Sequence, residues 1–219
     1  MNRQCLLDES SKVALSLKCP SCLSALISTP PSPPVIYSLT SGHPQSSQIL
    51  TRYTNEGGVQ DNLDILPLTT EEAYLEANPF ARPARALMHM CSQGDMGGIF
   101  KLLQTVDEDH EDGEQNSMSP ADLLRYQDPL DGMKSALHLG IESGKQEIVW
   151  LLLWLASDVP DAKFPEEAIH VAESVHASRQ STAGGVDIRS LHNAQGQTAR
   201  TVANAIGRGW ISLLQSGIL

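Results

Sequence analysis

The sequence predicts an all-α fold, a short solenoid of helix–turn–helix units that follows a disordered N-terminal tail. In three places after residue 84, apolar residues at helical spacing indicate a short helix, a glycine turn and a second helix that carries a pair of leucines. Before residue 61, serine and proline are abundant, and such a segment buries too little apolar surface to offset the entropy of ordering.

The N-terminal part is therefore expected to hold little regular structure. Residues 1–60 are predicted to be a disordered Ser/Pro-rich tail, and residues 61–83 a linker with one short helix. That helix is expected to follow a threonine cap, Thr69 or Thr70, and to end at Asn78. The first 54 residues are rich in serine and poor in acids, which leaves open whether the tail is a processed leader.

The helical units carry a recognisable motif. Residues 135–138 read Ser-Ala-Leu-His, Gly144 separates the two helices of that unit, and residues 148–153 are apolar. Together with Gly-Gln-Thr-Ala at residues 196–199, this pattern resembles the ankyrin repeat, in which Thr-Pro-Leu-His opens the first helix. The resemblance implies an ankyrin-repeat domain over residues 84–219. Its helices are expected near residues 84–92, 97–105, 135–142, 146–156, 198–206 and 209–215.

The glycine turns are spaced more widely than the ankyrin period of about 33 residues, so the domain is expected to carry insertions at about residues 106–126 and 157–190. The first insertion holds an acidic run at residues 107–114, interpreted as a solvated loop, with a docking surface for a basic partner as the alternative. In the second, residues 165–178 are expected to form an added helix, and a degraded repeat is the alternative.

Two tryptophans lie where the ankyrin pattern has polar, outward positions. Trp150 and Trp154 are four residues apart, so a helix places both on one face. We expect residues 165–178 to cover them with Ile169 and its apolar neighbours. The alternative is an open partner site, because exposed tryptophans on a monomer mark a contact patch.

The sequence offers weak candidates for metal or acid–base chemistry. Cys19 and Cys22 form half of a zinc knuckle, for which only Cys5 and His43 are nearby further ligands. We interpret the pair as two unrelated cysteines, and we expect no metal and no cofactor. In the ankyrin family the histidine that corresponds to His138 ties its turn to a neighbouring repeat, and no nucleophile accompanies it here. We therefore expect no catalytic residues and no enzymatic activity.

The charge balance limits the partners. There are 26 acidic against 15 basic side chains, a net charge of −11, which argues against a binder of nucleic-acid phosphates. No apolar run reaches the about 18 residues of a membrane span, and four cysteines make no disulfide scaffold. We expect a monomer of the cytoplasm or the nucleus, without nucleic-acid or membrane partners.

The ankyrin resemblance implies a non-enzymatic protein-binding module, such as an adaptor or an escort for a basic client protein. The alternative is a zinc-dependent or nucleic-acid-binding N-terminal module that the repeats merely carry. Residues expected to contact a protein partner are Gln127, Asp128, Asp131, Met133, Glu142, Ser143, Asn193, Gln195 and Gln197, with Trp150 and Trp154 if they are uncovered.

Overall fold

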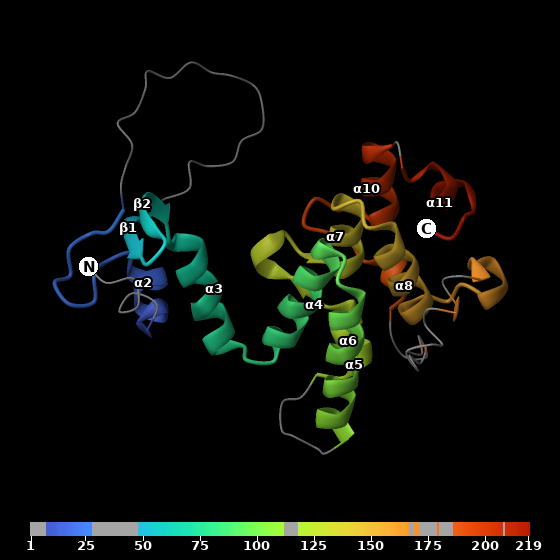
Figure 1. The fold of residues 1–219 in the computed structure, drawn as a ribbon, viewed down its shortest axis with the longest axis horizontal. Helices are drawn as coiled ribbons and strands as arrows, with labels where there is room; N and C mark the ends of the chain where they lie inside the picture. The colour runs from blue at the N-terminus through green and yellow to red at the C-terminus, as the bar shows by residue number, and fades with distance from the viewer. Residues whose placement is uncertain are drawn as a thin grey trace. The chain divides into compact units, whose positions relative to one another are not determined.

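The computed structural model describes residues 8–27, 48–111, 118–166, 169–170, 179, 186–207 and 209–219 (Figure 1). The chain divides into two compact units, Met1–Pro79 and Phe80–Leu219. The prediction of an all-α fold is wrong, because each unit contains a small two-stranded antiparallel sheet beside its helices. In the described part of the chain, no helix combines the length and the apolar character that crossing a bilayer requires.

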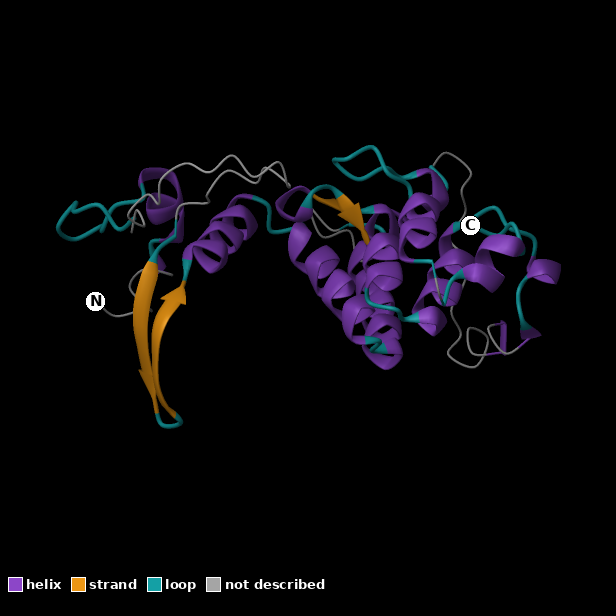
Figure 2. Ribbon diagram, turned by 90° about the horizontal axis from the view of Figure 1, so that it is seen from above, coloured by secondary structure: helices purple, strands orange, loops and turns teal. Residues whose placement is uncertain are grey.

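The first unit contains a β-hairpin between two helices. Its elements in chain order are α2 (Ser10–Ser16), β1 (Leu50–Asn55), β2 (Gly58–Asp64) and α3 (Leu66–Ala77). The strands pair from Leu50 opposite Asp64 to Asn55 opposite Gly58, and they form a long ribbon (Figure 2). Threonine, tyrosine and valine in these strands favour extended backbone, and the turn between them is rich in glycine.

A small apolar core holds this unit together. It consists of Val13, Ile49 and Ile65, against which four half-buried leucines pack. The prediction of a disordered tail over residues 1–60 is therefore wrong for residues 8–27 and 48–60, which include α2, β1 and part of β2. The composition of the segment did not indicate this core, because its three buried residues are far apart in sequence. The remainder of the predicted tail lies outside the described residues.

Helix α3 begins earlier than its threonines suggested. It starts at Leu66, with Pro67 in its first turn, where a missing N–H costs no helical hydrogen bond. Thr69 is buried inside the helix, and its hydroxyl donates to the carbonyl oxygens of Ile65 and Leu66. At the C-terminal end, Asn78 caps the helix as expected, since its backbone N–H donates to Tyr74 O.

The second unit is built from paired helices. They are α4 (Ala81–Gln93), α5 (Met96–Glu111), α6 (Pro120–Arg125), α7 (Ala136–Glu142), α8 (Gln146–Ala156), α10 (Ala199–Ile206) and α11 (Ile211–Gln215). Helix α4 packs against α5, α7 against α8, and α10 against α11, while α7 lies between α4 and α10 (Figure 1). The six predicted helices correspond to α4, α5, α7, α8, α10 and α11, whereas α6 was not predicted. The unit begins at Phe80 instead of residue 84.

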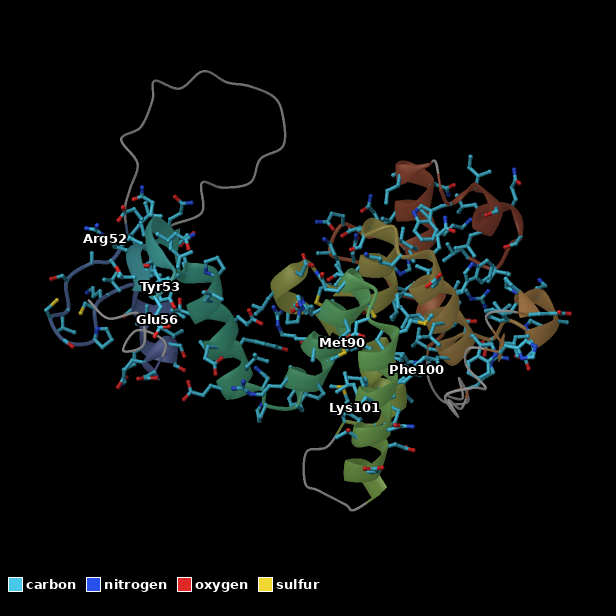
Figure 3. The ribbon with its side chains drawn as sticks, viewed as in Figure 1. Arg52, Tyr53, Glu56, Met90, Phe100 and Lys101 are labelled. Carbon is cyan, nitrogen blue, oxygen red and sulfur yellow. The ribbon has the colours of Figure 1, made fainter. Side chains whose placement is uncertain are left out.

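One continuous apolar core joins the helix pairs. Met90 of α4 and Phe100 of α5 contribute to it from neighbouring helices (Figure 3). Helix α7 approaches α8 so closely that a Cβ atom at Gly140 would lie 3.1 Å from Cγ2 of Val149. Glycine is thus required at this position by the packing of the pair.

The described ends of the first predicted insertion contribute to the core through Val106, Leu123 and Leu124. Helix α5 continues to Glu111, so residues 107–111 of the acidic run are helical, and residues 112–117 lie outside the described residues. Helix α6 packs against α4, α5 and α8, and its Leu123 and Leu124 are buried. Ser119 caps α6, because its Oγ accepts the N–H of Asp122 at 3.1 Å.

The second predicted insertion is described only in part. It contains two short 3₁₀ turns, η2 (Asp161–Lys163) and η3 (Ile188–Ser190), and most of the helix expected at residues 165–178 lies outside the described residues. Within that segment, Ile169 is half-buried and packs against the core of the second unit.

Candidate protein-binding surface

A short hairpin precedes α7 and carries four of the predicted contact residues. Strands β3 (Gln127–Asp128) and β4 (Lys134–Ser135) pair across the 3₁₀ turn η1 (Pro129–Asp131). Gly132 and Met133 complete the turn with left-handed backbones, at φ values of 58° and 57°. This conformation costs free energy at a methionine, and the hydrogen bond from Met133 N to Asp128 O, at 2.8 Å, holds it in place.

Asp128 anchors this hairpin to helix α4. Its side chain is nearly fully buried and pairs with the guanidinium of Arg85. Its other carboxylate oxygen accepts the N–H of Leu130 at 2.9 Å and so caps η1. Both oxygens are used inside the fold, and Asp128 does not offer a free contact to a partner.

A second turn, at residues 192–198, is closed by one buried side chain. His192 and Thr198 form an antiparallel bridge. Between them, Oδ1 of Asn193 accepts the N–H groups of Gln195 and Gln197, at 3.0 and 2.9 Å. Asn193 is therefore structural, and Gln195 is left exposed at the outer end of the turn.

Direct hydrogen bonds join the two turns. The N–H of Ala194 donates to Gly132 O at 2.7 Å. Nε2 of Gln127 donates to His192 O at 2.6 Å and to Met133 O at 2.8 Å. Gln127 thus connects the turns, and its amide nitrogen is fully occupied.

His138 forms a third link beneath the turns. Its Nδ1 accepts the N–H of Ser135 at 3.3 Å and faces the Ser135 hydroxyl at 2.8 Å. Its Nε2 lies 3.0 Å from Gln197 O, which can only accept, so the ring is neutral with its proton on Nε2. Burial lowers the pKa of His138, which agrees with the neutral form. This is the structural role that the ankyrin resemblance implied for the residue.

Six of the exposed residues in this region define what we call the tip surface: Leu130, Asp131, Met133, Glu142, Ser143 and Gln195. Leu130 and Met133 are 39 % and 40 % exposed. Lys134 connects the acidic members, since its Nζ lies 3.3 Å from Asp131 and 2.9 Å from Glu142. The tip surface therefore combines two apolar side chains with an acidic, partly neutralised margin.

The tryptophans do not belong to this surface. Trp154 is buried, and Trp150 is half-buried with its ring edge-to-face against Phe164, at 6.1 Å between centroids. The Arg179 guanidinium lies over the rings of Trp154 and Phe164, at 5.9 and 5.8 Å, and its Nε donates to Trp154 O. The described side chains that contact the two rings are Phe164 and Arg179. Ile169 packs against the same core, and the rest of the segment expected to cover the tryptophans lies outside the described residues.

The candidate zinc ligands lie in the first unit. Cys19 is buried and Cys22 is exposed, and both are free thiols. Over the described ranges, no group of three or more His, Cys, Asp or Glu side chains is arranged to hold a metal ion. The two further candidates, Cys5 and His43, lie outside those ranges.

No protein-family model, no curated protein and no solved structure matches the chain. The ankyrin resemblance consequently depends on the residues of this chain alone.

Sequence reasoning missed several residues that shape this surface. Arg85 reaches Asp128 from another helix, and no local pattern indicates that pair. Lys134 and Glu142 meet because the backbone turns between them, which helix spacing alone does not reveal. Leu130 could have been identified from the sequence, because it is an apolar residue inside the turn sequence Pro-Leu-Asp-Gly, where polar residues are typical.

Proposed function

We propose that the chain is a non-enzymatic protein-binding module and that the tip surface contacts its partner. The observation that supports this proposal most is the exposure of Leu130 and Met133 on a turn whose buried polar groups bond one another. Hydrogen bonds inside the protein account for the shape of the turn, so exposure of the two apolar side chains serves no need of the fold. Apolar groups presented on a pre-organised frame are typical of contact sites.

The charge of the chain favours a basic partner. The net charge is −11, and Asp131 and Glu142 lie beside the apolar pair. A basic protein would approach faster at low salt, and its cationic side chains would meet the acidic margin while apolar groups cover Leu130 and Met133. The motif at residues 135–138, which resembles the ankyrin repeat, supports the same class of function, an adaptor or an escort for a basic client. We propose that the module acts as a monomer.

Affinity capture with matched variants tests this proposal. The full chain is immobilised and incubated with a cell extract, and the proteins that it captures are eluted with increasing salt. Leu130→Asp combined with Met133→Asp should abolish capture of a basic protein, because the change places charge where the partner buries apolar surface. The control is Ile211→Asp, since Ile211 is 53 % exposed on α11 of the same unit.

Circular dichroism melting first establishes that both variants are folded. Capture that Ile211→Asp retains and the tip double variant loses, with release at high salt, supports the proposal. A captured protein that binds the wild type and the tip double variant equally contradicts it, and so does binding that salt does not weaken.

A further inference from the structure

A tight turn in the first unit brings two cysteines together. Lys18 and Ala25 form an antiparallel bridge, and inside it the N–H of Cys19 donates to Ser24 O at 2.9 Å. The N–H of Leu23 donates back to Cys19 O, also at 2.9 Å. These bonds close the five-residue turn 19–23, in which Cys19 is the first residue and Cys22 the fourth. The first and fourth residues of a tight turn are less than about 7 Å apart between Cα atoms, and a disulfide requires about 4.4–6.8 Å.

The two thiols have different surroundings. Cys22 is exposed, and its Sγ lies 3.3 Å from the Ser24 hydroxyl. Hydrogen bonds from Ser24 and from the Cys19 side chain lower the pKa of the Cys22 thiol. Cys19 is only 1 % exposed, although it neighbours Cys22 in the turn. One thiol is therefore accessible from solvent, and the second is shielded from it.

Cys91 provides an internal contrast. It is fully buried in the second unit, and burial raises its pKa to about 12. Because the thiolate is the reactive form, Cys91 is expected to be inert at neutral pH. Of the cysteines that the structure describes, only Cys22 combines exposure, a lowered pKa and an adjacent thiol.

We propose that Cys19 and Cys22 form a reversible dithiol–disulfide pair that exchanges with low-molecular-weight disulfides such as oxidised glutathione. The Cys22 thiolate attacks one sulfur of the glutathione disulfide, which releases one glutathione thiolate and leaves a mixed disulfide on Cys22. The Cys19 thiol then attacks the Cys22 sulfur and gives up its proton, and the second glutathione leaves and takes up that proton. In sum, two protein thiols and one glutathione disulfide give one protein disulfide and two glutathione thiols.

The backbone of the turn is suited to such a switch. Leu17 and Leu23, which flank the pair, both have left-handed backbones, at φ values of 53° and 58°. This conformation is unfavourable for leucine, so the reduced turn is held by its hydrogen bonds against local strain. A covalent bond between Cys19 and Cys22 would secure the same turn, and oxidation is expected to make the segment more resistant to proteolysis.

A redox titration of the full-length chain tests the proposal. The protein, carrying Cys5→Ser to remove the one cysteine outside the described ranges, is equilibrated with mixtures of reduced and oxidised glutathione and quenched with acid. Cleavage after Lys18 leaves both cysteines on one peptide. In the oxidised state this peptide should lose two hydrogen atoms and resist alkylation at both positions, and reduced glutathione should reverse the change.

Single variants identify the roles of the two thiols. Cys19→Ser and Cys19→Ala should both stop at the glutathione adduct on Cys22, whereas Cys22→Ser should leave Cys19 unmodified. Cys91→Ser, the control, should titrate like its parent. The proposal is overturned if only the mixed disulfide accumulates with both thiols present, if Cys19 reacts as readily in Cys22→Ser, or if the purified chain retains zinc that Cys22→Ser loses.

Discussion

The two hairpins of this protein differ in strand length and in the contacts that anchor them to the rest of their units. The hairpin of the first unit has strands of six and seven residues, and the hairpin of the second unit has strands of two residues each. Most of β2 is exposed, and the long hairpin is anchored at its base, where the N–H of Ile65 donates to Ile49 O at 3.0 Å. The short hairpin is instead anchored along its whole length by Asp128, Gln127 and the neighbouring turn.

The comparison indicates that the number of contacts anchoring a hairpin does not follow from the length of its strands. An isolated two-stranded hairpin is marginally stable in water, whatever its number of ladder hydrogen bonds. Buried side-chain hydrogen bonds add stability because their loss leaves unpaired polar groups inside the fold. The contact surface that we propose lies on the short hairpin, which has more of these buried bonds.

The largest effect is expected at the anchor of the short hairpin. Asp128→Ala removes the pair with Arg85 and the cap of η1. The free energy of unfolding should fall by about 3 kcal/mol, at the lower end for a buried pair, because Arg85 is 21 % exposed. Denaturant unfolding measures it, and Asp131→Ala, at an exposed position of the same turn, should change it by less than about 0.5 kcal/mol.

A smaller, pH-dependent effect is expected at His138. The folded state lowers the pKa of His138, so the unfolded chain binds a proton first as pH falls. Stability from this residue is complete above about pH 6.5 and declines as pH falls through the lowered pKa of the folded state. His138→Gln should cost about 1–3 kcal/mol at pH 7 and should lose this part of the pH dependence. Unfolding measured at pH 7.5 and 5.5 would contradict the account if wild type and variant declined equally.

The long hairpin should respond mainly at its base. Ile65→Val removes one methylene from the small core of Val13, Ile49 and Ile65, at an expected cost of about 0.5–1.5 kcal/mol to the first unit. Hydrogen exchange of β1 and β2 amides reports the loss. Val59→Ala, on the exposed part of β2, is the control and should leave exchange at the base unchanged.

The smallest effect is expected at the surface of the same hairpin. Arg52 lies 3.1 Å from Asp61 across the strands, but these side chains are 70 % and 62 % exposed. Arg52, labelled in Figure 3, is at the surface of β1. Arg52→Ala should change stability by less than about 0.5 kcal/mol, as measured by thermal melting. A larger loss of stability would indicate that the charge pair between Arg52 and Asp61, and not the apolar core at the base, stabilises this hairpin.

Local patterns made much of the second unit predictable. The helix pairs follow from the spacing of apolar residues, and the structural role of His138 follows from its motif. Helix α6 was missed because six residues are too few for a periodic signal, although Ser119 followed by Pro120 is a typical helix start. The long hairpin was missed, and the segment at residues 127–133 was expected only as a hairpin turn between helices. Both hairpins are anchored by residues distant in sequence, such as Ile49 with Val13 and Asp128 with Arg85.

The predicted contact residues fall into two groups, those that are exposed and those that form hydrogen bonds inside the fold. Asp131, Met133, Glu142, Ser143 and Gln195 are exposed, but Gln127, Asp128, Asn193 and Gln197 are used inside the turns. Asp and Asn side chains in turns commonly bond the backbone just after them, so their polarity is a poor guide to exposure. The sequence could identify the turns, but it could not distinguish the residues that stabilise a turn from the residues that are exposed on it.

Amide hydrogen exchange of the two hairpins tests the central claim most directly. The claim is that the tip surface is a rigid frame in the free protein. The amides of Ala194 and Met133, which donate to Gly132 O and Asp128 O, should then be protected nearly as strongly as amides of the buried helix α8. Amides in the exposed part of β2 should exchange at least about tenfold faster, because local opening there disrupts little buried surface. If Ala194 and Met133 exchange as fast as the exposed part of β2, the frame is not pre-organised and the assignment of the tip surface is wrong.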